Sequence, residues 1–115
     1  MLRGEIRSVD LDAARSGEAD KHRPAVVVSN DGANAAAARL GRGVLTVVPV
    51  TSSVERVHPF QVLLPAQDTG LEQDSKAQAE QVRSVSMDRM GSKLGSVPPS
   101  LMLEVDEALR LHLAL

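Results

Sequence analysis

Two continuous runs of apolar residues predict strands that are buried on both faces. Residues 25–30 contain three consecutive valines, and residues 44–50 are apolar apart from one threonine. Runs this continuous are typical of strands covered on both sides, because a half-exposed strand alternates apolar and polar positions. Pro49 has no N–H to donate, which indicates that the second strand ends there or lies at an edge.

Weaker patterns predict four further strands. Residues 5–11 alternate polar and apolar side chains, which is typical of a half-buried strand. Residues 60–64, 76–86 and 93–97 alternate less regularly, and we expect a strand in each. The stretches 12–21 and 51–59 are rich in small and polar residues and are predicted to be loops.

Two helices are expected among these strands. The alanine-rich residues 33–39 favour a short helix, with Asn30 or Asp31 as its N-cap. The second helix begins at the proline pair 98–99, because proline suits the first helical turn. Its apolar residues recur every four positions and form one stripe: Leu101, Val105, Leu109 and Leu113.

Many short strands followed by one helix predict a mainly β protein, a small barrel with helical additions. The 115 residues form a single domain without an internal repeat, and a chain of this length buries enough surface for a core. No cysteine is present, which excludes disulfides and thiolate metal sites. Because no apolar run reaches the length of a membrane span, we expect a soluble, cytoplasmic protein.

The charge and the aromatic content argue against a protein that coats nucleic acids. The formal net charge is −2, and Phe60 is the only aromatic residue among Phe, Tyr and Trp. The single aromatic residue also argues against base stacking on an aromatic platform. Any RNA chemistry must depend on a local group of arginines. Arg23 is the leading candidate, because it stands with Pro24 at the mouth of the valine strand.

Six segments resemble the MazF/PemK-like toxin family, in the order and near the spacing of that family. The likeness covers nearly the whole chain. The segments are Arg3-Gly4-Glu5-Ile6 with Val9-Asp10-Leu11, Gly17-Glu18 with Arg23-Pro24, Ser29-Asn30-Asp31, Val48-Pro49-Val50-Thr51-Ser52, Ala79-Glu80-Gln81-Val82-Arg83-Ser84, and the tail 101–109. The resemblance implies an SH3-like barrel with a C-terminal helix.

The family resemblance also implies an activity and partners. It implies a homodimeric endoribonuclease that needs neither a metal nor a cofactor nor the ribosome. Such toxins cut single-stranded RNA at short sequences. Messenger RNA is the expected target, and ribosomal RNA and transfer RNA are the alternatives. A cognate MazE-like antitoxin neutralises them, and the free toxin causes growth arrest.

The resemblance carries the catalytic roles to Arg23 and Thr51. The chemistry agrees, because a guanidinium fork can bind the non-bridging phosphate oxygens and a hydroxyl can add a donor. The general base stays open among His22, His58 and Glu18, because a guanidinium does not give up its proton near neutral pH.

Further residues are expected to bind substrate. They are Glu18, His22, Ser52, His58, Glu80, Gln81 and Arg83. If residues 76–86 are one extended strand, Gln81 and Arg83 share a face and Glu80 points the other way. Gln81 then suits a base edge, whereas Arg83 holds a phosphate or pairs with a carboxylate. The three histidines lack metal-ligand spacing, so no metal site is expected.

Two rival functions are also compatible with such a small barrel. A CcdB-like toxin shares the fold but binds DNA gyrase without cutting RNA. That family ends in Trp-Gly-Ile, whereas this chain has no tryptophan and ends in Leu113-Ala114-Leu115. The second rival is a catalytically silent barrel that only binds partners, and the presence of both Arg23 and Thr51 speaks against it.

Overall fold

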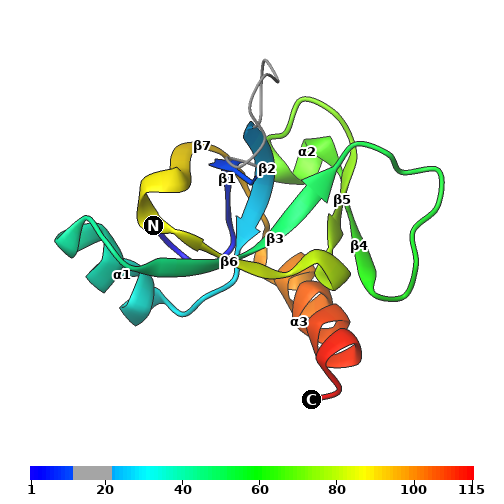
Figure 1. The fold of residues 1–115 in the computed structure, drawn as a ribbon. Coiled ribbons are helices and arrows are strands. Elements are labelled where there is room, and N and C mark those ends of the chain that lie inside the picture. The colour runs from blue at the N-terminus through cyan, green and yellow to red at the C-terminus, as the bar shows by residue number, and fades with distance from the viewer. Residues whose placement is uncertain (12–21) are drawn as a thin grey trace.

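The structure, a computed structural model, describes residues 1–11 and 22–115. Its elements follow one another along the chain as shown in Figure 1. The strands are β1 (Glu5–Asp10), β2 (His22–Val27), β3 (Val44–Thr51), β4 (Gln61–Leu64), β5 (Ser75–Gln78), β6 (Arg83–Ser86) and β7 (Met90–Ser96). The α-helices are α1 (Asp31–Leu40), α2 (Ala66–Thr69) and α3 (Pro99–Leu113), and two short 3-10 turns are η1 (Ala79–Gln81) and η2 (Met87–Arg89).

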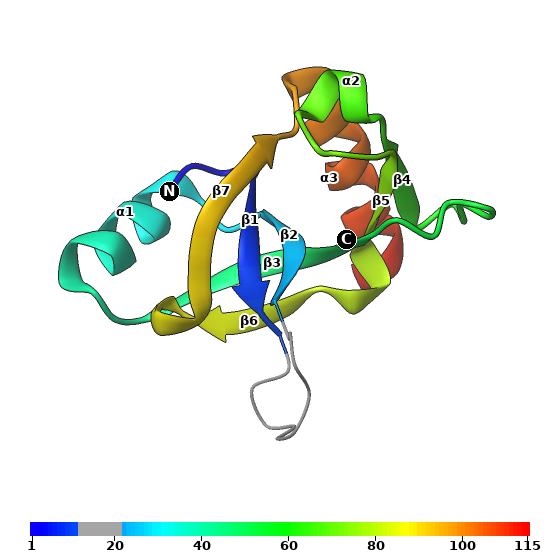
Figure 2. The same cartoon turned by 90° about the horizontal axis from the view of Figure 1, so that it is seen from above.

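The strand β3 organises the sheet. The strand order is β4-β5-β3-β2-β1-β7, and β6 pairs with β3 as well, all in antiparallel fashion. The helices α1 and α3 lie at opposite ends of the sheet (Figures 1 and 2). The predicted fold class, a mainly β, SH3-like barrel with a C-terminal helix, is confirmed.

The largest part of the core lies between the sheet and α3. Ile6, Val26, Val48 and Leu64 from four strands are fully buried there against Val105 of the helix. The predicted helical stripe holds for its first three members, since Leu101 and Leu109 also pack on this cluster. The stripe fails at Leu113, which is 48% exposed because α3 extends beyond the strands at its end. Within the described ranges, no helix has both the length and the apolar character needed to cross a membrane.

The predicted strand 76–86 is wrong in its middle. It divides into β5 and β6, and the 3-10 turn η1 separates them. β5 ends its pairing with β3 at Val50, and β6 resumes it at Val47, so residues 78–82 lie opposite only Val48 and Pro49. Five residues cannot pair with two in an extended ladder, so the five residues form a turn.

The expectation that Pro49 places strand 44–50 at an edge of the sheet is wrong. β3 pairs with β2 on one side and with both β5 and β6 on the other. Proline is tolerated here because the ladder to β5 and β6 is interrupted beside it.

The helix α1 is capped as the sequence predicts. Asn30 is the N-cap residue, and its Oδ1 accepts a hydrogen bond of 2.7 Å from the N–H of Ala33. Asn34 was not expected from the sequence to have a structural role, yet it is fully buried. Its Nδ2 donates to the carbonyl oxygen of Ser29 at 2.8 Å, and its Oδ1 accepts from the Ser29 hydroxyl. These bonds attach α1 to the end of the valine strand.

The C-terminal end of α2 presses directly against β7. A Cβ atom added to Gly95 would lie 2.3 Å from the carbonyl oxygen of Thr69. Gly70, the residue that ends α2, adopts a left-handed conformation with φ of 85°. The contact between residues 69–70 and β7 therefore requires glycine at position 95.

We expect Gly95→Ala to destabilise the protein by about 1–3 kcal/mol, because the new methyl group must displace backbone. Urea unfolding followed by circular dichroism measures this loss. Ser96→Ala is the matched control, since Ser96 is exposed and its loss of a hydroxyl should change stability by less than about 0.5 kcal/mol. Equal unfolding midpoints for the two variants would contradict the tight contact.

Candidate active site

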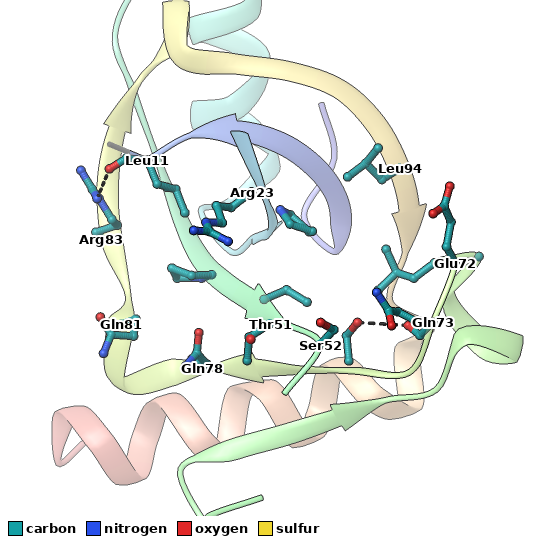
Figure 3. A pocket seen from close by; sticks show the side chains of 16 residues that line it. Leu11, Arg23, Thr51, Ser52, Glu72, Gln73, Gln78, Gln81, Arg83 and Leu94 are labelled. Atoms are coloured by element: carbon teal, nitrogen blue, oxygen red, sulfur yellow. Dashed lines mark hydrogen bonds between the residues drawn. The ribbon is translucent and has the colours of Figure 1, made fainter. Parts of the chain in front are cut away.

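A cavity of about 780 Å³ opens at the ends of β2 and β3. It is shown from close by in Figure 3. Five of the residues expected from the sequence line it: Arg23, Thr51, Ser52, Gln81 and Arg83. They come from β2, β3 with the residue after it, η1 and β6. The fold therefore gathers residues that are up to 60 positions apart in the chain.

The strand register explains why Arg23 and Thr51 line the same cavity. β2 and β3 pair antiparallel, with Ala25 opposite Pro49 and Val27 opposite Val47. The same register continued by two residues brings Arg23 opposite Thr51, and directly opposite residues share one face of a sheet. Both side chains line the cavity (Figure 3).

The guanidinium of Arg23 is available for a ligand. Arg23 is exposed, and among the described residues its side chain has no hydrogen-bond or ion-pair partner. β1 supports its backbone from the other side, since Val9 of β1 lies opposite Arg23. A cation on a rigid strand that lacks an internal partner is a ready site for an anion such as phosphate.

The hydroxyl of Thr51 is oriented by the chain that follows it. Its Oγ1 accepts a hydrogen bond of 3.2 Å from the N–H of Ser53, which leaves the O–H as the donor toward the cavity. Ser52 is exposed between them and also lines the cavity. The end of β3 thus offers two hydroxyl groups to the cavity that Arg23 also lines.

Arg83 is held by a backbone carbonyl group. Its Nη1 donates to the carbonyl oxygen of Leu11 at 2.7 Å (Figure 3). Of the two roles left open for Arg83, pairing with a carboxylate is therefore not observed among the described residues. The guanidinium has further N–H donors that this single bond does not use.

Gln81 reaches the cavity by a different route from the one expected. It does not share a strand face with Arg83, because η1 interrupts the strand at residues 79–81. The turn places Gln81 and Gln78 side by side on the cavity lining (Figure 3). Gln78 was missed by the sequence analysis, because its place depends on the break in the strand.

Two expected residues lie outside the cavity lining. Glu80 accepts a hydrogen bond of 2.8 Å from Gln61, and Gln61 in turn accepts one of 3.1 Å from the N–H of His58. The His58 ring stacks on Phe60, with the ring centroids 5.1 Å apart. Glu80 and His58 are therefore linked to β4 and not to the group around Arg23.

The remaining two expected residues are His22 and Glu18. His22 is exposed and precedes Arg23 on β2, but it does not line the cavity. Neighbours on a strand point to opposite faces, which accounts for this separation. Glu18 lies outside the described residues, and so does the predicted loop 12–21. In the described ranges, no group of three or more His, Asp or Glu residues is placed to hold a metal ion.

The other side of the cavity was not predicted at all. Glu72 and Gln73 line it together with Leu71 and Leu94. Residues 65–74 are mostly polar, and Gly70 indicates a turn among them, but a turn glycine does not tell which way the next side chains point.

Known proteins resemble this chain along its whole length. The sequence profile of the PemK-like, MazF-like toxins of type II toxin–antitoxin systems matches residues 2–113. Endoribonuclease MazF9 of Mycobacterium tuberculosis is 61% identical over 115 residues, which cover 100% of this chain and 98% of that protein. Endoribonuclease EndoA of Bacillus subtilis is 31% identical over 114 residues, or 98% and 94% of the two chains.

A solved structure resembles the fold over the same extent. It is an endoribonuclease in complex with its cognate antitoxin from a mycobacterial species, with a TM-score of 0.77 and 27% identity. The match covers 100% of this chain and 96% of that one. The chain therefore belongs to the family of PemK-like, MazF-like toxins of type II toxin–antitoxin systems. Within that family it is an endoribonuclease of the MazF type.

Proposed function

We propose that this endoribonuclease cuts single-stranded RNA at a short sequence, without a metal or the ribosome, and leaves 2′,3′-cyclic phosphate and 5′-OH ends. The observation that carries the proposal is the pair formed by Arg23 and Thr51. A guanidinium without an internal partner among the described residues and a hydroxyl face one cavity, at positions that match the family's catalytic pair.

The reaction uses the nucleophile that RNA itself provides. The 2′-oxygen forms a bond to the adjacent phosphorus, the bond from phosphorus to the 5′-oxygen breaks, and the 5′-oxygen leaves with a proton. Negative charge increases on the non-bridging oxygens as the phosphorus becomes five-coordinate. Arg23 stabilises that charge with two parallel N–H donors, and Thr51 adds an O–H donor to the same phosphate.

The 2′-OH proton must pass to a base other than Arg23, because a guanidinium stays protonated. Neither His22 nor His58 lines the cavity. Of the three candidates from the sequence, Glu18 is the one whose place the described residues do not decide. We propose Glu18 as the first residue to replace in a test for the general base.

Substrate binding involves the other polar groups of the cavity. Ser52 and Gln81 lie on either side of Thr51 in Figure 3, where they flank the proposed position of the phosphate. Gln81 suits an unstacked base, since its amide offers both a donor and an acceptor. Arg83 binds the carbonyl oxygen of Leu11, which also lines the cavity, and its other N–H donors can bind a second phosphate.

We further propose that the chain forms a homodimer and that a MazE-like antitoxin neutralises it in the cytoplasm. A solved relative is in complex with its cognate antitoxin, which supports the second partner. Exposed leucines on and after α3 support the first, since Leu103, Leu111 and Leu115 are 67%, 58% and 84% exposed. Apolar surface of this kind is what a second subunit buries.

The test is a cleavage assay on a long single-stranded RNA with EDTA present, in which cut positions and end groups are sequenced. We expect repeated cuts at one short motif with cyclic phosphate and 5′-OH ends. Cutting that stops with EDTA would contradict metal independence. No cutting by a folded protein free of antitoxin would favour a binding-only toxin of the CcdB type, and inhibition of DNA gyrase would then be measured.

A further inference from the structure

The cavity has a second group of side chains that the proposed cleavage chemistry does not use. Glu72 and Gln73 project from the segment after α2, and Leu94 comes from β7. In Figure 3 the three lie together on the side of the cavity away from Arg83, with Thr51 and Ser52 between the two sides. If an RNA strand binds with its scissile phosphate at Arg23 and Thr51, a nucleotide adjacent to that phosphate lies against this group of side chains.

Local hydrogen bonds fix the backbone that carries Glu72 and Gln73. The Asp74 carboxylate accepts from the N–H of Ala66 at 2.9 Å, and the Ser75 hydroxyl donates to the carbonyl of Gln73 at 3.0 Å. On the other side, Leu71 donates its N–H to the Thr69 hydroxyl at 3.3 Å and packs on the main core. Together with the close contact at Gly95, these bonds keep residues 70–75 in one place.

The side chains on this backbone are free, although the backbone itself is held. Glu72 and Gln73 are exposed, and neither side chain has a hydrogen-bond or ion-pair partner among the described residues. Leu94 is 42% exposed beside them and offers apolar surface to the cavity. A rigid backbone that presents unused donors and acceptors is the arrangement that specific recognition requires.

We propose that Glu72 and Gln73 read the Watson–Crick edge of one base next to the scissile phosphate, while Leu94 supports the face of that base. The inference rests on the proposed function, because the base belongs to the RNA bound at Arg23. Sequence-specific recognition of RNA depends on unstacked bases whose edges are free to form hydrogen bonds. With a leucine in place of an aromatic ring, the discrimination comes from the edge.

The chemistry of Glu72 predicts which bases are preferred. An ionised carboxylate accepts hydrogen bonds and donates none. The Watson–Crick edges of adenine, cytosine and guanine each carry an amino group, whereas uracil presents two carbonyl oxygens around a single N–H. The position facing Glu72 therefore favours an amino-bearing base and disfavours uracil.

The experiment compares variants on an RNA pool randomised around the cut motif, with cut sites read by sequencing. We expect Glu72→Gln to weaken the discrimination against uracil at one flanking position by about tenfold, because a charged hydrogen bond is lost. Gln73→Ala should relax the same or the adjacent position. Asp68→Asn and Gln67→Ala are matched controls, since both residues are exposed on α2 outside the cavity lining.

The outcomes separate this inference from the proposed function. Relaxed cut sites in both cavity variants, with unchanged end groups and wild-type cut sites in both controls, support the inference. Identical cut sites in wild type, Glu72→Gln and Gln73→Ala overturn it and leave RNA cleavage intact. A wild-type protein that neither cuts nor binds RNA overturns both.

Discussion

Replacing Arg23 with alanine should lower the rate of RNA cleavage by at least about 100-fold, the typical loss when a preorganised donor to a developing oxyanion is removed. The structure gives Arg23 no internal partner among the described residues, so its loss breaks no ion pair there. The free energy of unfolding should therefore change by less than about 0.5 kcal/mol. Single-turnover cleavage and urea unfolding measure the two effects on the same sample.

Two further variants separate the role of Arg23 in phosphate binding from its charge. Arg23→Lys keeps the charge but loses the planar fork, and we expect only partial recovery of the rate. Arg42→Ala removes the same charge from an exposed position near the end of α1, outside the cavity lining, and should leave the rate unchanged. A folded Arg23→Ala protein that cuts RNA at the wild-type rate would refute the catalytic assignment.

Replacing Ile6 with alanine should have the opposite profile, with a large loss of stability and an intact site. Ile6 is fully buried in β1 opposite Val26 and belongs to the core cluster under α3. Such a truncation costs about 2–5 kcal/mol, because it removes apolar contacts and leaves a cavity. That is a large share of the roughly 5–15 kcal/mol that stabilises an ordinary domain. The midpoint of urea unfolding measures the loss.

The controls for Ile6 are a smaller truncation and an exposed one. Ile6→Val should cost only about 0.5–1.5 kcal/mol. Leu2 is 58% exposed, so Leu2→Ala should stay within about 0.5 kcal/mol of the wild type. At temperatures where Ile6→Ala stays folded, its cleavage rate per folded molecule should equal that of the wild type. Indistinguishable unfolding midpoints for Ile6→Ala and Leu2→Ala would show that this part of the core is not where the structure places it.

The elements whose signals are local can be predicted from the amino-acid sequence alone. The apolar run predicts the valine strand, Asn30 or Asp31 predicts the start of α1, and the stripe of leucines and valine predicts α3. The Arg23 and Thr51 pair also came from the sequence, through its resemblance to the toxin family. The strand register then places both residues at the same cavity, since each stands two positions beyond the paired residues Ala25 and Pro49 of β2 and β3.

Which other side chains share that cavity depends on contacts between segments that are distant in the chain. Residues 76–80 alternate polar and apolar side chains as a strand would, yet residues 79–81 form a turn because β3 offers two positions where the chain has five residues. That turn brings Gln78 and Gln81 to the cavity and leaves Glu80 bonded to Gln61. Glu72 and Gln73 line the opposite side because Gly95 allows α2 to approach β7. Contacts of this kind join segments that are distant in the chain, and hydrophobic periodicity reports only on near neighbours.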